Sequence, residues 1–298
     1  MLAILTTHPI QYQVPLWRAL AARGQVPFRV LYMSDRGLAA RFDPGFGRAI
    51  AWDIDLTSDY PHEFLDVERG SSEEAFLGLK LKPGFGRKLQ REGYRAMWIQ
   101  GWQTAAYWQA VWMARSAGLE VWLRGETNLR SNASGGRMRI AKRLLLGELL
   151  RRVDRYLYIG SANRAFYLAR GIALDRLSPA PYGVDNARFA HSAATLKPER
   201  LALRSAFGID PDAFCFLFVG KLQPKKRPQD LLTAVRDLRT RLPGNKRVQV
   251  LLIGTGELEA ALRASSPDEV FVGFLNQSEI AKAYVAADCL VLVARQSG

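Results

Sequence analysis

The chain has 298 residues, 48% hydrophobic and 23% charged, which is ordinary for a soluble globular protein of about two domains. Its 42 lysines and arginines against 28 aspartates and glutamates leave a net charge of +14. This excess favours a polyanionic partner such as nucleic acid, an acidic membrane surface or a phosphorylated substrate, and a merely basic solvated surface is the alternative. No apolar run reaches the roughly 18 residues of a spanning helix. We expect a cytoplasmic protein without a signal peptide.

Short apolar runs alternate with helical patterns along the whole chain. The runs predict strands at 2–7, 28–33, 95–100, 120–125, 155–160, 214–219, 248–253, 270–272 and 289–294. Apolar residues at helical spacing predict helices at 11–23, 103–117, 161–170, 227–241 and 277–287. Several runs are apolar without alternation, as expected for parallel strands covered on both faces. The pattern predicts a doubly wound α/β architecture.

A domain boundary is expected near residue 190. The stretch PAPYGVDNARFAHSAATLKPER, which begins at Pro179, holds three prolines and neither clear period, as is typical of a linker. We therefore predict two Rossmann-like domains facing a cleft, with residues 1–190 in the N-terminal domain and 191–298 in the C-terminal domain. The chain ends directly after a predicted strand, where a doubly wound sheet usually has its ligand loop. We expect the second domain to be incomplete.

Polar and aromatic residues follow the predicted strands of the N-terminal part. His8 comes after the first strand, where an imidazole can bind a sugar or phosphate oxygen or transfer a proton; a loop histidine bonded to local backbone is the alternative. Arg124 and Glu126 follow another strand, and Glu126 can orient a hydroxyl group unless it is simply solvated. Trp98 and Trp102 flank a third strand end and suit a sugar ring, although core packing is expected for at least one of them.

A basic segment, FVGKLQPKKRPQDLLTAV at residues 218–235, precedes a predicted helix. A helix N-terminus is already partly positive, so lysines are disfavoured there unless an anion is present. Gly220 lets the backbone approach a ligand, while Lys221 and Lys226 supply compact charges for a phosphate at the carboxyl end of the strand. A solvated basic turn is the alternative, and a P-loop is excluded because its sequence is absent.

Two more glycine turns follow strands in the C-terminal part. LLIGTGELEAAL contributes Gly254 and Gly256, but the third glycine of the dinucleotide fingerprint is missing, which argues against NAD. VFVGFLNQSEI places Gly273 at a strand end, where backbone groups of Phe274 and Leu275 can read the edge of a nucleobase. A plain strand-to-helix turn is the alternative for both segments. The cysteines form no C-x-x-C pair, so we expect no metal site.

The segment RMRIAKRLLLGELLRRVDR at residues 137–155 predicts an amphipathic helix with seven basic residues. Its expected apolar face consists of Leu145, Leu146, Leu149, Leu150 and Val153. A helix docked on the core with a solvated basic face is one interpretation. Contact with anionic lipid is the other, with about 1 kcal/mol per near-surface cation.

Taken in order, these segments resemble the retaining glycosyltransferases of the GT-B fold, group 1 or family 4. FVGKLQPKKRPQDLLTAV resembles the family's Val-Gly-Arg-Leu pattern followed by Lys and an apolar helix, and PYGVDNARF resembles its Gly-Val-Asp segment. LLIGTGELEAAL, VFVGFLNQSEIAKAYVAADCLVLVA and the opening THPIQYQVPLWRAL fit in order and spacing. The likeness covers most of the chain and is most specific through residues 157–298.

The resemblance implies roles for individual residues. Lys221, where the family usually has arginine, and Lys226 would hold the donor diphosphate and stabilise the leaving nucleotide, with His8 in the loop that approaches donor and acceptor. Glu126 stands where many relatives have histidine, and with Trp102 it would lie on the acceptor side. The implied donor-binding residues are Gly220, Gly254, Gly256, Gly273, Phe274 and Leu275. The donor is a nucleotide sugar, and neither a cofactor nor a metal ion is expected.

We therefore expect an enzyme that transfers a sugar from a nucleotide-diphosphate donor to a hydroxyl group with retention. The expected acceptor is a lipid-linked or cell-envelope glycan at the inner face of the membrane. A GT-B-like sugar-nucleotide epimerase or phosphorylase is the alternative. Nucleic acid is not expected, because zinc-finger and RNP-type segments are absent. The family's paired glutamates should follow the last strand, where the sequence stops at ARQSG, so we expect these 298 residues alone to be inactive.

Overall fold

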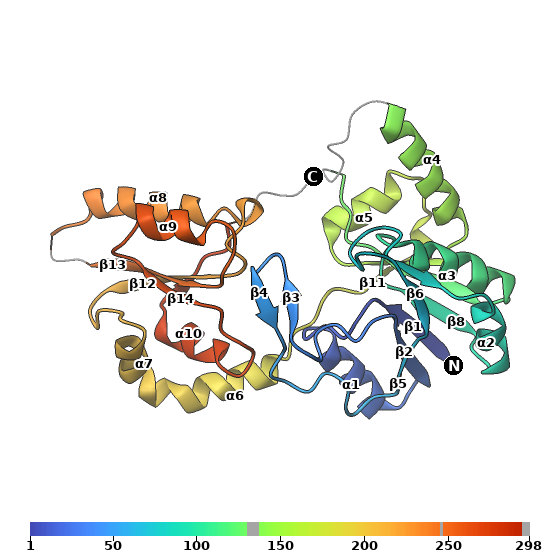
Figure 1. Ribbon diagram of the computed structural model, residues 1–298, viewed down its shortest axis with the longest axis horizontal. Coiled ribbons are helices and arrows are strands. Elements are labelled where there is room, and N and C mark those ends of the chain that lie inside the picture. The colour runs from blue at the N-terminus through green and yellow to red at the C-terminus, as the bar shows by residue number, and fades with distance from the viewer. Residues whose placement is uncertain (130–136, 245–246, 294–298) are drawn as a thin grey trace. The chain divides into compact units, whose positions relative to one another are not determined.

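A computed structural model describes residues 1–129, 137–244 and 247–293, with side chains omitted for 137–143. The chain forms two compact units, each with its own parallel sheet and core. Unit 1 comprises Met1–Arg36 and Leu56–Val184, and unit 2 comprises Gly37–Asp55 and Asp185–Ser297. The predicted doubly wound α/β architecture is confirmed (Figure 1).

The sheet of unit 1 has seven parallel strands in the order β11-β10-β9-β8-β1-β2-β5. From β1, an inner strand, the chain first builds the β2 side and then the β8 side, so the strand order reverses between β1 and β8. In doubly wound sheets, ligands bind at such a reversal. The strands are β1 (Leu2–Thr6), β2 (Phe28–Tyr32), β5 (His62–Phe64), β8 (Ala96–Ile99), β9 (Glu120–Arg124), β10 (Arg155–Tyr158) and β11 (Leu177–Pro179).

The core of unit 1 lies between this sheet and its covering helices. Trp17 of α1 and Tyr107 of α3 are fully buried, and α3 packs on β7, β8 and β9. The helices are α1 (Val14–Arg23), α2 (Phe85–Arg91), α3 (Ala105–Ser116), α4 (Arg137–Arg151) and α5 (Ser161–Leu168), followed by the 3₁₀ turn η1 (Leu174–Arg176). A short antiparallel pair joins β6 (Val67–Arg69) and β7 (Leu79–Leu81).

The sheet of unit 2 has four parallel strands in the order β14-β13-β12-β15. Its order reverses between β12 and β15. These strands are β12 (Phe214–Val219), β13 (Val248–Ile253), β14 (Val270–Gly273) and β15 (Cys289–Leu290). One face is covered by α8 (Pro228–Arg241) and α9 (Glu259–Ser265), and the other by α6 (Asn186–Leu196), α7 (Arg200–Ala206) and α10 (Ile280–Ala286), with the 3₁₀ turn η2 (Lys197–Glu199) between α6 and α7 (Figure 1).

A two-stranded hairpin from the first part of the chain belongs to unit 2. It pairs β3 (Arg41–Asp43) with β4 (Arg48–Ile50) in antiparallel register. Its flanking residues, from Gly37 to Asp55, are grouped with the second unit although unit 1 precedes and follows them in sequence. We call residues 37–55 the hairpin segment.

All nine predicted strands are present, and β12 and β13 have the predicted bounds. The prediction of a linker after Pro179 is wrong, because α6 occupies much of it. The Asp185 carboxylate accepts the Arg188 N–H at 2.9 Å and caps this helix, and Phe189 packs edge-on against Tyr284 of α10. The compact units divide between Val184 and Asp185 rather than at 190, and the hairpin segment joins unit 2.

The basic helix is shorter than predicted. It ends at Arg151, and Leu149, Leu150 and Val153 are buried as expected, whereas Leu145 is 59% exposed and does not belong to the apolar face. Four of its basic side chains lie outside the described residues, namely Arg137, Arg139, Lys142 and Arg143. Among the described residues, no helix combines the length and apolar character needed to cross a bilayer.

Candidate functional site

The three predicted glycine turns of unit 2 meet at the carboxyl edge of its sheet. The Gly254 N–H donates to the Gly273 carbonyl at 2.7 Å, which joins the loops after β13 and β14. The Leu222 N–H donates to the Thr255 carbonyl at 2.9 Å, which joins the loops after β12 and β13. All three segments therefore lie side by side at the edge where a parallel sheet binds its ligand.

Close packing between these loops explains two of the glycines. A Cβ atom on Gly254 would lie 2.0 Å from the Gly220 carbonyl oxygen, and a Cβ atom on Gly256 would lie 2.6 Å from that of Leu222. Gly254 also has φ +133°, a conformation that side chains disfavour. Gly220 has open space on the corresponding side, with its nearest neighbours 3.8 Å away on Phe218. Contact of these glycines with a donor stays a prediction.

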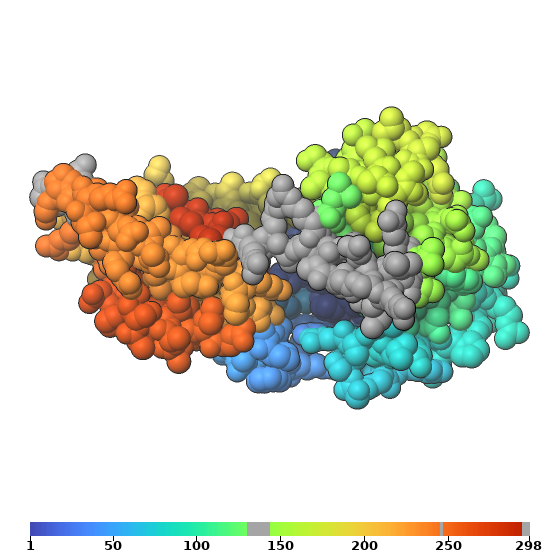
Figure 2. Space-filling view, turned by 90° about the horizontal axis from the view of Figure 1, so that it is seen from above, coloured from blue at the N-terminus to red at the C-terminus, as the bar shows by residue number. Residues whose placement is uncertain are grey.

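Lys221 already has an anion from its own chain. Its Nζ donates to Asp43 Oδ1 at 2.7 Å and lies 4.5 Å from the centre of the Phe46 ring. Both partners belong to the hairpin segment, which is light blue in Figure 2 and lies against the orange surface of unit 2. The side chains of Lys221 and Asp43 are 32% and 21% exposed, so the pair is partly accessible to water.

Asp43 also shapes the turn that carries it. Its Oδ1 accepts the backbone N–H groups of Gly45 at 2.8 Å and Phe46 at 3.2 Å. Burial alone would raise the pKa of Asp43, but the hydrogen bond and charge of Lys221, together with these two amides, hold it below its usual value. Asp43 is therefore ionised at neutral pH and acts as an internal anion.

The hairpin segment also covers the predicted base-contacting turn. The Phe274 ring meets Phe46 edge-on at 5.2 Å and Trp52 at 6.1 Å, and the Arg48 guanidinium lies 5.5 Å from its centre. Thr255 Oγ1 donates to the Phe46 carbonyl at 2.6 Å. Sequence patterns gave no role to these residues, although the turn signal in DPGFG, between short apolar-polar runs, indicates a hairpin.

The remaining cations of the basic segment do not lie in the first turn of α8. Lys225 and Lys226 belong to the 3₁₀ turn η3 (Pro224–Lys226), and α8 begins at Pro228, one residue after the predicted start. Arg227 adopts φ +49° between the two and pairs with Asp230. In the part of the chain that the structure describes, no carboxylate pairs with Lys226, and its side chain is exposed.

In unit 1, His8 directly follows β1, as predicted. Its Nδ1 lies 2.9 Å from Thr7 Oγ1. Burial, together with the positive charge of Arg36, lowers the pKa of His8 to about 4, against the opposing effect of Glu73 and Glu74. The imidazole is therefore neutral at pH 7. It can exchange hydrogen bonds without carrying charge, and its contact with a ligand stays a prediction.

The predicted acceptor residues Glu126 and Trp102 line one cavity of about 380 Å³ in unit 1. Its walls are the residues after β8 and those at the end of β9, which are neighbouring strands. The Trp102 indole packs closely against Gly125, where a Cβ atom would be 2.1 Å from the ring, and it stacks on Phe166. Glu126 accepts the hydroxyl of Tyr182. We call this the β8–β9 pocket; its residues are Gln100, Gly101, Trp102, Gln103, Arg124, Gly125, Glu126 and Thr127.

Trp98, by contrast, is a core residue, 7% exposed, and packs edge-on against Trp17 at 5.5 Å. The expectation that one of the two tryptophans has a packing role is therefore confirmed. The Arg124 guanidinium lies over the Trp98 ring, 5.0 Å from its centre.

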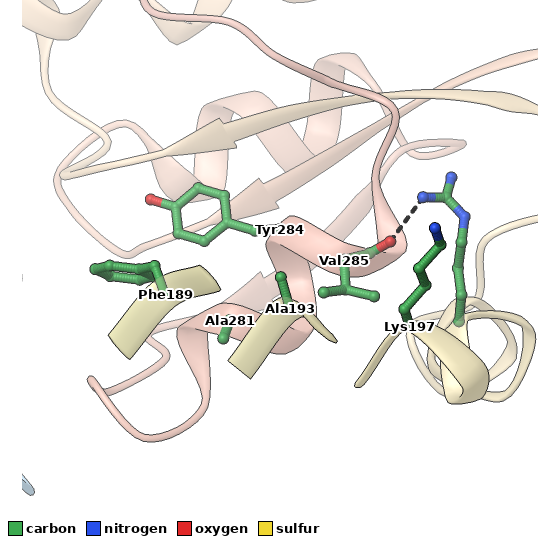
Figure 3. Close-up of a pocket in the computed structure, with 7 residues that line it drawn as sticks. Phe189, Ala193, Lys197, Ala281, Tyr284 and Val285 are labelled. Carbon is green, nitrogen blue, oxygen red and sulfur yellow. Dashed lines mark hydrogen bonds between the residues drawn. The ribbon is translucent and has the colours of Figure 1, made fainter. Parts of the chain in front are cut away.

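Another cavity of unit 2, about 390 Å³, lies away from the strand ends (Figure 3). Phe189 and Ala193 of α6 and Ala281 and Tyr284 of α10 form its apolar walls. Arg200 donates to the Val285 carbonyl at 2.8 Å at its edge. No residue that follows the carboxyl end of a strand lines this cavity, so it is not the predicted donor site.

Residues 199–297 match the family model for glycosyl transferases group 1. The chain is 34% identical over 129 residues to D-inositol 3-phosphate glycosyltransferase 2 of Catenulispora acidiphila, covering 39% of this chain and 29% of that protein. It is 33% identical over 129 residues to D-inositol 3-phosphate glycosyltransferase of Pseudarthrobacter chlorophenolicus, covering 41% of this chain and 29% of that protein. Less than a third of each relative's length is therefore matched.

Solved structures share the fold over nearly the whole chain. A glycosyltransferase of Rickettsia africae gives a TM-score of 0.65 at 10% identity, covering 98% of this chain and 73% of that one. WaaG, a glycosyltransferase involved in lipopolysaccharide biosynthesis, gives 0.61 at 14% identity, covering 99% and 75%. HepE of Anabaena in complex with UDP and glucose gives 0.59 at 12% identity, covering 98% and 74%. The chain has the GT-B type of fold, built from two Rossmann-like units.

Proposed function

We propose that this protein is a glycosyltransferase that moves a sugar from a nucleoside-diphosphate donor to a hydroxyl group of an acceptor, with retention of configuration. One observation carries the proposal. Gly220-Lys221, Gly254–Gly256 and Gly273–Leu275 lie side by side at the carboxyl edge of the unit 2 sheet, inside the segment that matches glycosyl transferases group 1. The structural neighbour bound to UDP and glucose supports a nucleotide sugar as the donor.

The chemistry fits this edge. When a glycosidic bond to a diphosphate breaks, negative charge develops on the leaving phosphate, and cations held in place stabilise it. Lys221 and Lys226 supply that charge, and the backbone of Phe274 and Leu275 contacts the base. The family resemblance implies retention and neither metal ion nor cofactor, and these remain part of the proposal.

In unit 1 the proposal assigns the acceptor to the β8–β9 pocket. The Trp102 indole offers an apolar face to a sugar ring, and the Glu126 carboxylate accepts a hydrogen bond from a sugar hydroxyl. His8, neutral at pH 7, contacts the sugar at the end of β1. We take the acceptor to be a lipid-linked or cell-envelope glycan.

The donor assignment is tested by calorimetric titration of uridine, guanosine and adenosine diphosphates into the full chain. Lys226→Ala and Lys221→Ala are each expected to weaken the best nucleotide at least tenfold, about 1.4 kcal/mol. Lys225→Ala is the matched control in the same turn, and it should leave affinity within twofold. Unchanged affinity in both lysine variants would sink the diphosphate assignment.

The alternative chemistries use the same kind of site, so products separate them. Incubation of the protein, in the longest form that its natural reading frame encodes, with a nucleotide sugar and hydroxyl acceptors gives a glycoside and free nucleoside diphosphate if the proposal is right. A C2-epimerised sugar nucleotide would indicate an epimerase, and a sugar phosphate formed from inorganic phosphate would indicate a phosphorylase. Either product without glycoside would contradict the transfer reaction.

Peripheral contact with the inner face of the membrane is proposed for the α4 region. The net charge of +14 and the exposed side chains of Leu144 and Leu145 support it. In vesicle sedimentation, binding to vesicles with anionic lipid is expected at low salt and should fall at high salt. Equal binding to neutral vesicles, or none to either, would rule the contact out.

A further inference from the structure

Arg124, the last residue of β9, is buried without hydrogen-bond acceptors for part of its guanidinium. Arg124 is only 2% exposed. Within the described ranges, its Nε and Nη2 atoms have no hydrogen-bond partner. A buried cation is strongly unfavourable unless an anion or several acceptors surround it. Arg124 therefore lacks part of the environment that its charge requires.

The aromatic neighbours of Arg124 stabilise its positive charge but provide no hydrogen-bond acceptors for its N–H groups. The guanidinium lies 5.0 Å from the ring centre of Trp98 and 4.5 Å from that of Tyr182, and both are cation–π contacts. The face of an aromatic ring attracts a cation, but it leaves the in-plane N–H groups without an oxygen acceptor. The nearby Glu126 carboxylate accepts the Tyr182 hydroxyl, and it forms no ion pair with Arg124 in the part of the chain that the structure describes.

The chain offers no further carboxylate for this site from the residues outside the description. Residues 130–143, 245–246 and 294–298 contain neither aspartate nor glutamate. No side chain of these residues therefore supplies a carboxylate to Arg124.

A second donor without a partner lines the same cavity. The Nε2 atom of Gln100, the first residue after β8, is buried and has no hydrogen-bond partner among the described residues. Gln100 and Arg124 both line the β8–β9 pocket, which lies beside the reversal of strand order in unit 1. One cavity thus brings together a cation, an amide donor, the carboxylate of Glu126 and the aromatic wall of Trp102.

We propose that the β8–β9 pocket binds an oxyanion, a phosphate or a carboxylate, carried by a hydroxylated acceptor, with Arg124 and Gln100 donating to its oxygens. Arg124 donates through Nε and Nη2, the geometry that suits two oxygens of one anion. Glu126 accepts from a hydroxyl on the same molecule, and Trp102 lies against its ring. Binding of the anion stands on the pocket alone, whereas its assignment to the acceptor rests on the proposed sugar transfer.

The experiment compares three ligands with the same ring: glucose 6-phosphate, glucuronate and glucose. Calorimetry on the full chain is expected to show at least tenfold tighter binding of one of the two anions than of glucose. The preferred anion identifies the source of the charge as a phosphate or a carboxylate. Equal affinity for all three sugars, or binding of none, would overturn the proposal.

Two variants connect the preference to Arg124. Arg124→Met keeps the volume of the side chain and removes its charge and donors, so the preference for the anion should fall to less than twofold. Arg152→Met is the matched control, because Arg152 also lies over an aromatic ring, at 4.7 Å from the centre of Trp112, but pairs with Glu148. It should retain the wild-type preference. A preference that survives in Arg124→Met contradicts the assignment.

A parallel titration with uridine diphosphate separates this inference from the proposed function. Arg124→Met should bind uridine diphosphate as the wild type does, since the donor residues lie in unit 2. If the wild type prefers the anionic sugar but binds no nucleoside diphosphate, the pocket is supported and the transfer reaction fails. If nucleotide binds and the anion preference is absent, the inference fails and the proposed function stands.

Discussion

Lys221 at the edge of the unit 2 sheet has a carboxylate partner from its own chain, whereas Arg124 at the edge of the unit 1 sheet has none among the described residues. Lys221 is about one-third exposed and Arg124 is almost fully buried. Lys221 follows β12 and Arg124 ends β9, so both lie at the carboxyl edge of a parallel sheet, where such sheets bind ligands. The two sites therefore differ in whether an anion is present: Lys221 pairs with the Asp43 carboxylate, and Arg124 has no anionic partner among the described residues.

This difference has a consequence for how each site binds. An anion that approaches Lys221 competes with Asp43, so part of its interaction energy is used to displace a carboxylate. An anion that reaches Arg124 supplies acceptors that the described residues of the chain do not provide. The first arrangement keeps the empty site stable, and the second makes binding selective for a charged ligand.

The largest expected effect concerns how the two edges are built. Gly254→Ala places a Cβ atom against the Gly220 carbonyl oxygen, and Gly254 has φ +133°, which side chains disfavour. Because the backbone at Gly220 cannot move aside easily, the free energy of unfolding should fall by about 3 kcal/mol. Gly125→Ala meets the Trp102 ring, a side chain that can tilt, and should cost less. Denaturant unfolding of both variants checks this. A smaller loss for Gly254→Ala than for Gly125→Ala would reverse the comparison.

The second effect is the pH dependence that His8 gives to unit 1. Its pKa is about 4 in the folded chain and about 6.5 when unfolded, so between these values the unfolded state binds the extra proton. This stability is present above pH 6.5 and is lost as pH falls towards 4. The wild type should lose about 2 kcal/mol between pH 7 and pH 5 through His8. His8→Gln should lose correspondingly less, and an identical pH profile in denaturant unfolding would contradict burial of a neutral imidazole.

A smaller effect separates the two cations through stability alone. Lys221→Met removes the ammonium group that pairs with the partly buried Asp43 and should lower the unfolding free energy by about 1 kcal/mol. Arg124→Met strands no anion, and its unfolding free energy should not fall by as much. If Arg124→Met lowers the free energy of unfolding more than Lys221→Met does, Arg124 has a partner within the chain, and the proposed difference between the two cations is wrong.

The smallest effect is a gain of affinity. Asp43→Asn removes the charge that competes for Lys221 but keeps an oxygen for the Gly45 and Phe46 amides, so the turn should persist. Affinity for the best nucleoside diphosphate should rise by about fivefold. Glu148→Gln, at an exposed ion pair of α4 in the other unit, is the control and should change nothing. Weaker nucleotide binding in Asp43→Asn would mean that the hairpin holds the ligand rather than competing with it.

Sequence patterns predicted the parallel sheets well because buried parallel strands are continuous apolar runs; β12 and β13 were found with their bounds. The family resemblance implied that Glu126 and Trp102 lie on the acceptor side, and both line the β8–β9 pocket. Sequence patterns failed for α6, where three prolines near the ends of the segment concealed a helix capped by Asp185. Local composition marks such residues as turn formers, and tertiary packing decided otherwise.

The contacts that define the two cation sites were beyond sequence reasoning. Asp43 and Lys221 are far apart in sequence, and a short hairpin with exposed strands carries no periodic signal that places it on a distant sheet. Arg124 was noticed beside Glu126, but its missing acceptors are a property of burial, which no single-sequence pattern reports. For residues implied by the family resemblance, such as Lys226 and Leu275, contact with a ligand stays a prediction.

Competition between a nucleotide and Asp43 for Lys221 is tested by a structure of the chain with bound uridine diphosphate. The diphosphate is expected at the carboxyl edge of the unit 2 sheet, within hydrogen-bond distance of Lys221 Nζ. Asp43 is then no longer in contact with that nitrogen. A diphosphate bound elsewhere, with the Lys221–Asp43 ion pair intact, would contradict it.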